Sequence, residues 1–174
     1  MKLLIPLALL LATAAQAAPR ERIERGRYLV ATSGCADCHT PLKPGPRGPE
    51  PDEALAFAGH PQALAMPAVP VLPAGPWLVV SSATNTAWAG PWGVSFTANL
   101  TPDPDTGLGR WSEQDFVQTL RSGRHLGRGR PLLPPMPAAY GHMTDDDLRA
   151  VFAYLRTLAP IHNRVPAPLA PPSH

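Results

Sequence analysis

The chain has two cysteines, Cys35 and Cys38, and they lie within four residues of each other with His39 directly after them. This Cys-x-x-Cys-His spacing suits covalent attachment of a haem, because one helical turn carries both thiols to the porphyrin edge and places the histidine beneath the iron. A thioredoxin-like redox pair, a zinc site and an incidental cysteine pair are the competing interpretations. The first needs alternating strands and helices, and the second needs a fourth protein ligand and usually a second paired motif. The sequence shows neither, so we expect one covalent haem c.

The first residues are typical of an export signal. Lys2 is followed by an apolar run that ends at Leu11, and residues 15–17 read Ala-Gln-Ala, which fits a signal-peptidase cleavage pattern. We therefore expect residues 1–18 to be a signal peptide, cleaved near residues 17–18, and the mature protein to be periplasmic. The apolar run is shorter than the ~20 residues that a membrane span needs, so membrane association would come only through a partner. An uncleaved anchor is the alternative.

Three helices are predicted from capping and periodicity. A first helix over 20–33 leads directly into the cysteine pair, and Gly34 is its stop signal. Ser112 and Thr144 can each cap the start of a later helix, and the last helix is expected over 145–158. The apolar residues that flank the two caps, and that form hydrophobic staples, are Trp111 with Phe116 and Met143 with Leu148.

Much of the remaining chain is rich in proline. The 174 residues include 24 prolines, which interrupt helices and sheet interiors. Residues 43–90 are predicted to be a loop-like insertion that wraps a cofactor edge, with at most a short strand at 77–81. The domain is expected over 19–165, and residues 166–174 are expected to be a disordered tail. The formal net charge of +2 gives no electrostatic case for binding nucleic acid.

A haem iron needs a sixth ligand or an open site, and the chain offers several candidates. Met136 stands between Pro135 and Pro137, where the backbone has few accessible states, so its thioether could stay on iron without reordering. A methionine opposite a histidine gives an electron-transferring iron with a raised potential. Met143 is assigned instead to a helix start. The remaining candidates are Met66, which has a similar proline frame, and the histidines His60, His125 and His142.

Together these features resemble class I c-type cytochromes. The shared features are the helix entering the cysteine pair, the Met136-Pro137 pair and the last helix with Ala-Tyr-Leu-Arg at 153–156. A narrower resemblance comes from two stretches, NLTPD at 99–103 and MTDDDL at 143–148. Both are similar to cytochrome c subunits and partners of bacterial periplasmic dehydrogenases. The resemblance covers about 20–40 and 90–165. Those subunits often hold three haem domains, whereas this chain has one Cys-x-x-Cys-His, which favours a standalone carrier or a small monohaem subunit.

The resemblance carries expectations about structure. It implies an all-α, cytochrome c-like helical domain around one haem, in which the first and last helices cross and Gly26 permits close approach near Tyr154. By the same resemblance, His39 is the proximal ligand of the iron and Met136 the distal one, and Cys35 and Cys38 hold the haem. In the family a proline carbonyl orients the proximal histidine. The nearby candidates for that carbonyl are Pro41, Pro44 and Pro46.

The expected function is electron transfer without catalytic residues of the chain's own. A periplasmic dehydrogenase would be the donor, and another cytochrome or a terminal oxidase of the respiratory chain would be the acceptor. The alternative is a catalytic or gas-binding haem protein with an open sixth site, which gains ground if Met136 is not on iron. A structural subunit whose haem is secondary is a third interpretation, supported only by the insertion at 43–90.

Overall fold

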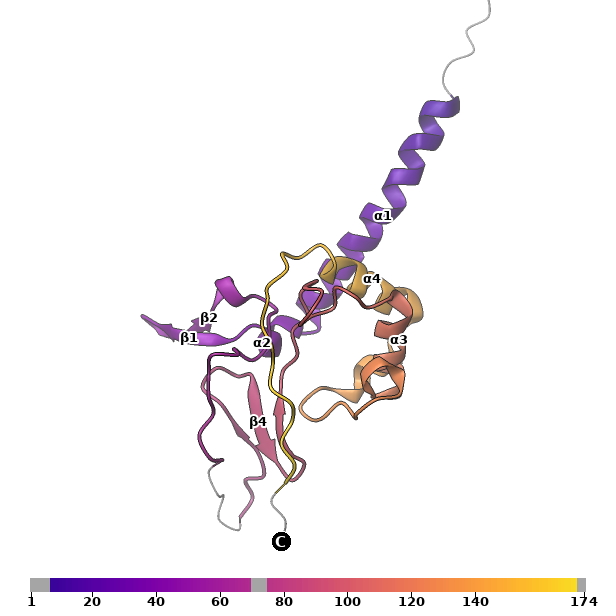
Figure 1. The fold of residues 1–174 in the computed structure, drawn as a ribbon. Coiled ribbons are helices and arrows are strands. Elements are labelled where there is room, and N and C mark those ends of the chain that lie inside the picture. Colours follow the sequence, from indigo (N-terminus) through magenta and orange to yellow (C-terminus); the bar gives the residue numbers. More distant parts are fainter. Residues whose placement is uncertain (1–6, 70–74, 172–174) are drawn as a thin grey trace, which may run out of the picture.

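A computed structural model describes residues 7–69 and 75–171 of the chain. Its helices and strands follow one another in a mixed order (Figure 1). In chain order they are α1 (Leu7–Thr32), α2 (Cys35–His39), β1 (Leu42–Gly45), β2 (Gly48–Pro51), β3 (Val80–Ser81), β4 (Ala87–Gly90), β5 (Gly93–Phe96), α3 (Glu113–Ser122) and α4 (Asp145–Leu155). Short 3-10 helices lie at Glu53–Leu55, His125–Gly127 and Ala138–His142.

The prediction of an all-α fold is wrong, because the insertion at 43–90 contributes to two antiparallel sheets. One is the hairpin of β1 and β2, and the other has the strand order β3-β4-β5. In the hairpin Pro44 lies opposite Pro49, a pairing that a two-stranded sheet tolerates because both of its strands are edges. The predicted short strand at 77–81 is present as β3. Proline content correctly indicated that the described part of the insertion contains no α-helix, but it did not show where the backbone forms its hydrogen bonds.

Helix α1 begins earlier than the sequence predicted. It runs continuously from Leu7 to Thr32 through Pro19, so it includes most of the predicted signal peptide at 1–18. Figure 1 shows its N-terminal part projecting away from the rest of the domain. Residues 1–6 lie outside the described part, and cleavage near residues 17–18 stays a prediction. Within residues 7–69 and 75–171, the helices are too short or too polar to cross a membrane.

The C-terminal half of α1 packs across α4, and Gly26 lies at the point of closest approach. A Cβ atom on Gly26 would lie 1.9 Å from the carbonyl oxygen of Ala150 and 2.8 Å from Cβ of Tyr154. The predicted approach of Gly26 to Tyr154 is therefore confirmed. Buried side chains of both helices, of α3 and of the preceding loop form one core: Leu29, Val30, Leu108, Phe116, Val151, Phe152 and Leu155.

The predicted helix starts are also confirmed. The Ser112 hydroxyl accepts a hydrogen bond from the Asp115 N–H at 3.1 Å, and the Asp115 carboxylate accepts one from the Ser112 N–H at 3.0 Å. At α4, the Thr144 hydroxyl accepts from the Asp147 N–H at 3.1 Å. Each bond satisfies a donor that the first turn of a helix leaves free. Helix α4 ends at Leu155, three residues before the predicted end.

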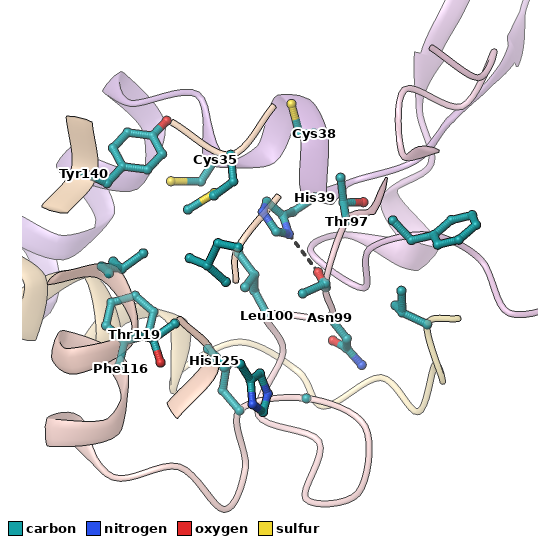
Figure 2. Close-up of a pocket in the computed structure, with 18 of the residues that line it drawn as sticks. Cys35, Cys38, His39, Thr97, Asn99, Leu100, Phe116, Thr119, His125 and Tyr140 are labelled. Carbon is teal, nitrogen blue, oxygen red and sulfur yellow. Dashed lines mark hydrogen bonds between the residues drawn. The ribbon is translucent and has the colours of Figure 1, made fainter. Parts of the chain in front are cut away.

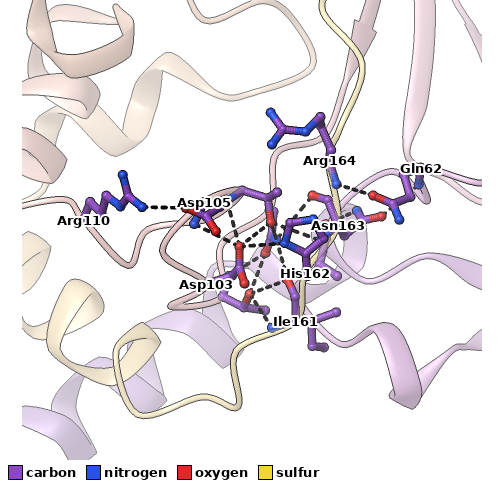
Figure 3. A network of polar contacts seen from close by, with 12 residues as sticks. Gln62, Asp103, Asp105, Arg110, Ile161, His162, Asn163 and Arg164 are labelled. Carbon is purple, nitrogen blue, oxygen red and sulfur yellow. Dashed lines mark hydrogen bonds and ion pairs between the residues drawn. The ribbon is translucent and has the colours of Figure 1, made fainter.

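The segment after α4 is fixed to the domain by a polar network around a tight turn at Asp103 (Figure 3). The Asp103 carboxylate accepts hydrogen bonds from the Thr106 N–H and hydroxyl, both at 2.7 Å, and from the Asp105 N–H at 3.1 Å. The Thr106 hydroxyl also accepts from the Asn163 N–H at 3.0 Å. Further along, Val94 and Leu169 exchange two backbone hydrogen bonds of 2.9 Å, which pair this part of the tail with β5. Residues 172–174 lie outside the described part.

The Asp103 turn should make part of the domain's stability depend on pH. The hydrogen bonds from Thr106 hold the pKa of Asp103 below its usual value. A carboxyl whose pKa is lower in the folded state stabilises the fold above the unfolded-state value of about 3.9 and loses that contribution as the pH falls. Asp103→Asn is therefore expected to unfold at lower denaturant concentration than wild type at pH 7, and the difference should shrink near pH 3.

Denaturant titrations at the two pH values measure this difference. Asp105→Asn is the matched control, because Asp105 is exposed and its ion pair with Arg110 lies on the surface. The prediction would be contradicted if the unfolding midpoints of wild type and Asp103→Asn differed by the same denaturant concentration at pH 7 and at pH 3.

Candidate functional site

The Cys-x-x-Cys-His stretch forms the short helix α2, which follows α1 after a sharp turn. Gly34 makes this turn with a φ of +69°, in the left-handed region that glycine adopts at low cost. The Tyr140 hydroxyl donates a hydrogen bond of 2.5 Å to the carbonyl of Ser33, just before the turn. The predicted site residues Cys35, Cys38 and His39 are thus presented together from one rigid turn (Figure 2).

These three residues border a cavity of about 430 Å³. That volume lies in the range of about 300–1,000 Å³ that small-molecule and cofactor sites occupy. Figure 2 shows the two cysteines and His39 on one side, with Phe116 and His125 across from them. The apolar part of the lining includes Leu100, Leu108, Phe116, Leu120, Leu132, Leu133, Val151 and Leu155. A wall of this composition excludes water from a bound planar cofactor.

His39 is oriented by a backbone carbonyl. Its Nδ1 lies 2.7 Å from the carbonyl oxygen of Ala98, and burial lowers the pKa of the imidazole. A neutral imidazole that donates a hydrogen bond from Nδ1 keeps a free electron pair on Nε2. This is the form in which histidine binds a metal. The expectation that this carbonyl belongs to Pro41, Pro44 or Pro46 is wrong. The chain returns to His39 after β5, 59 residues later, and supplies the acceptor from there.

The two cysteines are free and partly buried. Burial, with a smaller contribution from Asp37, raises the pKa of Cys35 to about 11 and also raises the pKa of Cys38. A thioredoxin-like pair needs a thiol whose pKa is lowered, because the thiolate is the nucleophile. The environment therefore disfavours the redox-pair interpretation. A zinc site gains no support either, because the parts of the chain that the structure describes hold no cluster of three or more metal-ligating side chains.

The cavity reduces the number of candidate sixth ligands. Met136, Met143 and His125 line it, whereas the other candidates do not. Met66 is 38% exposed and lies elsewhere on the insertion. His60 is buried, but its ring bonds Thr86 and the carbonyl of Leu64. His142 lies at the end of a 3-10 helix.

Among the three lining candidates, Met136 has no other structural role that the described residues reveal. His125 packs edge-on against Trp111 with ring centroids 5.1 Å apart. Met143 packs against the hydrophobic core, just before the start of α4. Met136 belongs to the irregular segment between Leu133 and Pro137, where it is half-buried beside the cavity.

One buried hydroxyl tests whether the cavity fits a haem. The Thr97 Oγ1 has no hydrogen-bond partner among the described residues, and Thr97 lines the cavity. A buried polar atom is normally paired, so a polar group of a bound molecule would complete it. Haem carries two propionates beside its apolar ring, and the cavity combines an apolar wall with this hydroxyl. The residues present therefore fit the group.

Sequence reasoning missed Ser95, Thr97, Ala98 and Tyr140, all of which contact the cavity or its boundary. Ala98 contributes a backbone carbonyl, which has no sequence signature. Ser95, Thr97 and Tyr140 are common residue types without characteristic spacing. A signal could have come only from recognising that 93–96 forms a strand whose end meets the histidine.

Comparison with known proteins decides the family. The family model for cytochrome c matches residues 23–159. The chain belongs to the cytochrome c family. Membership of this family makes the domain an electron-transfer component and supports a covalent haem c.

The relatives of this cytochrome c confirm the narrower resemblance. One subunit of nicotinate dehydrogenase from Pseudomonas putida is 30% identical over 147 residues, which cover 83% of this chain and 9% of the relative. The cytochrome c subunit of a quinone alcohol dehydrogenase from Gluconacetobacter polyoxogenes is 35% identical, with coverage of 80% and 25%. The gluconate 2-dehydrogenase cytochrome c subunit of Pantoea cypripedii is 33% identical, with coverage of 78% and 26%. The chain thus spans about a quarter or less of the length of these relatives.

Proposed function

We propose that this cytochrome c carries electrons with a single haem, bound through Cys35 and Cys38, with His39 and Met136 as the axial ligands of the iron. The observation that carries the proposal is the shared cavity, which brings Met136 to the same space as the cysteine pair and the buried imidazole. The chain contains one Cys-x-x-Cys-His, which supports one haem. His39 and Met136 would then be the metal ligands, and no residue of the chain would be catalytic.

The bound haem would supply reversible one-electron chemistry at its iron. The protein's contribution is to hold and shield that group. Ala98 keeps the His39 ring in one orientation and one tautomer, and the apolar lining would keep water away from the bound group. The proline frame around Met136 limits backbone motion, so a ligand there would change little between oxidation states.

For partners, we propose that a periplasmic dehydrogenase is the donor and that another cytochrome or a terminal oxidase of the respiratory chain is the acceptor. The support is the set of relatives, several of which are named as cytochrome c subunits of dehydrogenases. Export through residues 1–18 and a periplasmic location belong to the same proposal. Association with a membrane would then come only through a partner.

Optical spectra of the exported holoprotein test the axial ligands. The oxidised wild type is expected to show the weak near-infrared charge-transfer band of methionine-ligated ferric haem. Met136→Ala should lose this band completely, because alanine offers no donor atom. Met143→Ala is the matched control: it removes the other methionine of the cavity and should keep the band while lowering the stability of the fold.

Other results would contradict the proposal. If Met143→Ala loses the band and Met136→Ala retains it, the distal ligand has been assigned to the wrong methionine. If the wild type lacks the band and its reduced form binds carbon monoxide readily, the sixth site is open, and the alternative of a catalytic or gas-binding haem protein replaces the electron carrier.

A further inference from the structure

Strand β5 and the residues after it contact both sides of the cavity. The carbonyl of Ala98 accepts the hydrogen bond of His39 at 2.7 Å. Three residues earlier, the Ser95 hydroxyl donates a hydrogen bond of 2.5 Å to the carbonyl of Pro134, two residues before Met136. Both contacts join segments that are distant in sequence, 59 residues apart in the first case and 39 in the second.

We propose that Ser95 is a positioning residue for the distal ligand, and that the Ser95–Pro134 hydrogen bond keeps Met136 in the cavity. The inference rests on the proposed function, since it takes Met136 as the sixth ligand. Through Ser95 and Ala98, one continuous stretch of chain would then fix both axial ligands.

The composition of the Met136 segment explains why it needs a side-chain donor. Three of the four residues at 134–137 are prolines, which have no N–H to donate. The N–H of Met136 itself bonds locally to the carbonyl of Leu133 at 3.2 Å. The carbonyls are therefore the groups through which neighbouring elements can hold this segment, and a carbonyl requires a donor. The Ser95 hydroxyl supplies it.

Ser95 is well placed to act as a fixed anchor. It is 7% exposed and lies in β5 opposite Trp88 of β4. On the other edge of β5, Val94 is paired with Leu169, and just beyond the strand the N–H of Thr97 donates to the carbonyl of Thr86 at 2.9 Å. Backbone hydrogen bonds thus hold the strand on both sides of Ser95 and fix the backbone that carries its hydroxyl. The other acceptor within reach, the carbonyl of Trp88, is more distant at 3.4 Å, so the shorter contact to Pro134 is the favoured one.

A second contact holds the other end of the Met136 segment. Four residues after Met136, the Tyr140 hydroxyl bonds the carbonyl of Ser33, beside the turn that presents the cysteine pair. Met136 therefore lies between two anchored points, Pro134 and Tyr140. Loss of the Ser95 contact would free one side of the segment and let the methionine leave the cavity more often, without removing any ligand atom.

The test is an imidazole titration of the ferric holoprotein, because added imidazole occupies the sixth position when the methionine leaves. Ser95→Ala is expected to bind imidazole about five-fold more tightly than wild type, the effect of losing one hydrogen bond that only the closed segment makes. The near-infrared band of Ser95→Ala should remain before imidazole is added, since Met136 is still present.

Ser112→Ala is the matched control, because it removes a hydroxyl that forms hydrogen bonds at the start of α3, away from this segment. Its imidazole affinity should equal that of wild type.

The outcomes separate this inference from the proposed function. A wild type without the methionine band overturns the proposed function and this inference with it. A wild type with the band, together with equal imidazole affinities for wild type and Ser95→Ala, overturns this inference alone. An equal increase in Ser95→Ala and Ser112→Ala also overturns it, because general destabilisation would then be the cause. If Ser95→Ala does not accumulate with haem, Ser95→Cys is titrated instead. A thiol is a weaker hydrogen-bond donor than a hydroxyl. The ferric Ser95→Cys protein should therefore still bind imidazole more tightly than wild type.

Discussion

Replacing both Cys35 and Cys38 by serine is expected to abolish covalent haem attachment completely. Each thioether bond needs a sulfur atom, and these two residues are the only cysteines in the chain. Mass spectrometry of the denatured protein should show the haem adduct in the wild type and the bare chain in the double variant. Haem-stained denaturing gels should agree. Because the proposed haem would fill the cavity beside the core, the double variant should also accumulate poorly after export.

The single variants Cys35→Ser and Cys38→Ser are the matched controls, since each keeps one thiol. Both should retain a covalent adduct in reduced yield. A wild type that carries no covalent haem despite working maturation machinery, and whose mass changes by two hydrogens between oxidising and reducing conditions, would contradict the prediction. The redox-pair interpretation would then return, although the raised pKa of Cys35 gives that chemistry an unfavourable starting point.

Apart from the approach of Gly26 to Tyr154, which came from the family resemblance, the parts of the fold that the sequence predicted correctly are those with local signals. The caps at Ser112 and Thr144 involve hydrogen bonds across only three residues, so the pattern and the contact lie within one window. The sheets were missed because strand pairing is decided by distant partners. In the β1–β2 hairpin, prolines face one another, and proline content alone predicts a loop.

The site divides in a similar way. The residue types and their spacing identified the haem-binding candidates Cys35, Cys38 and His39, and the structure places all three at the cavity. The atoms that hold them in place are less visible in the sequence. The carbonyl of Ala98 could belong to any residue type, and the role of Ser95 depends on where Pro134 lies in space. Non-local backbone contacts of this kind follow from the fold and cannot be found from residue spacing.

Gly26→Ala is expected to destabilise the fold by about 3 kcal/mol, although alanine is the better helix former. In an exposed helix this substitution would gain about 1 kcal/mol. Here the added Cβ would lie 1.9 Å from the carbonyl oxygen of Ala150, which is part of the backbone of α4 and cannot rotate away. The two helices would have to separate, and Leu29 and Val30, one turn further along α1, would lose contact with the core. Guanidinium unfolding of the holoprotein, followed by far-UV circular dichroism, measures the loss.

Arg27→Ala is the matched control for Gly26→Ala, because Arg27 is the next residue of α1, is exposed and pairs with the exposed Glu24 on the same helix. Its unfolding free energy should stay within about 0.5 kcal/mol of wild type. A stabilised Gly26→Ala would mean that α1 and α4 do not approach closely at this point. The consequence would extend to the haem site: α1 continues through Gly34 into α2, so the packing at Gly26 also determines where Cys35 and His39 meet the cavity.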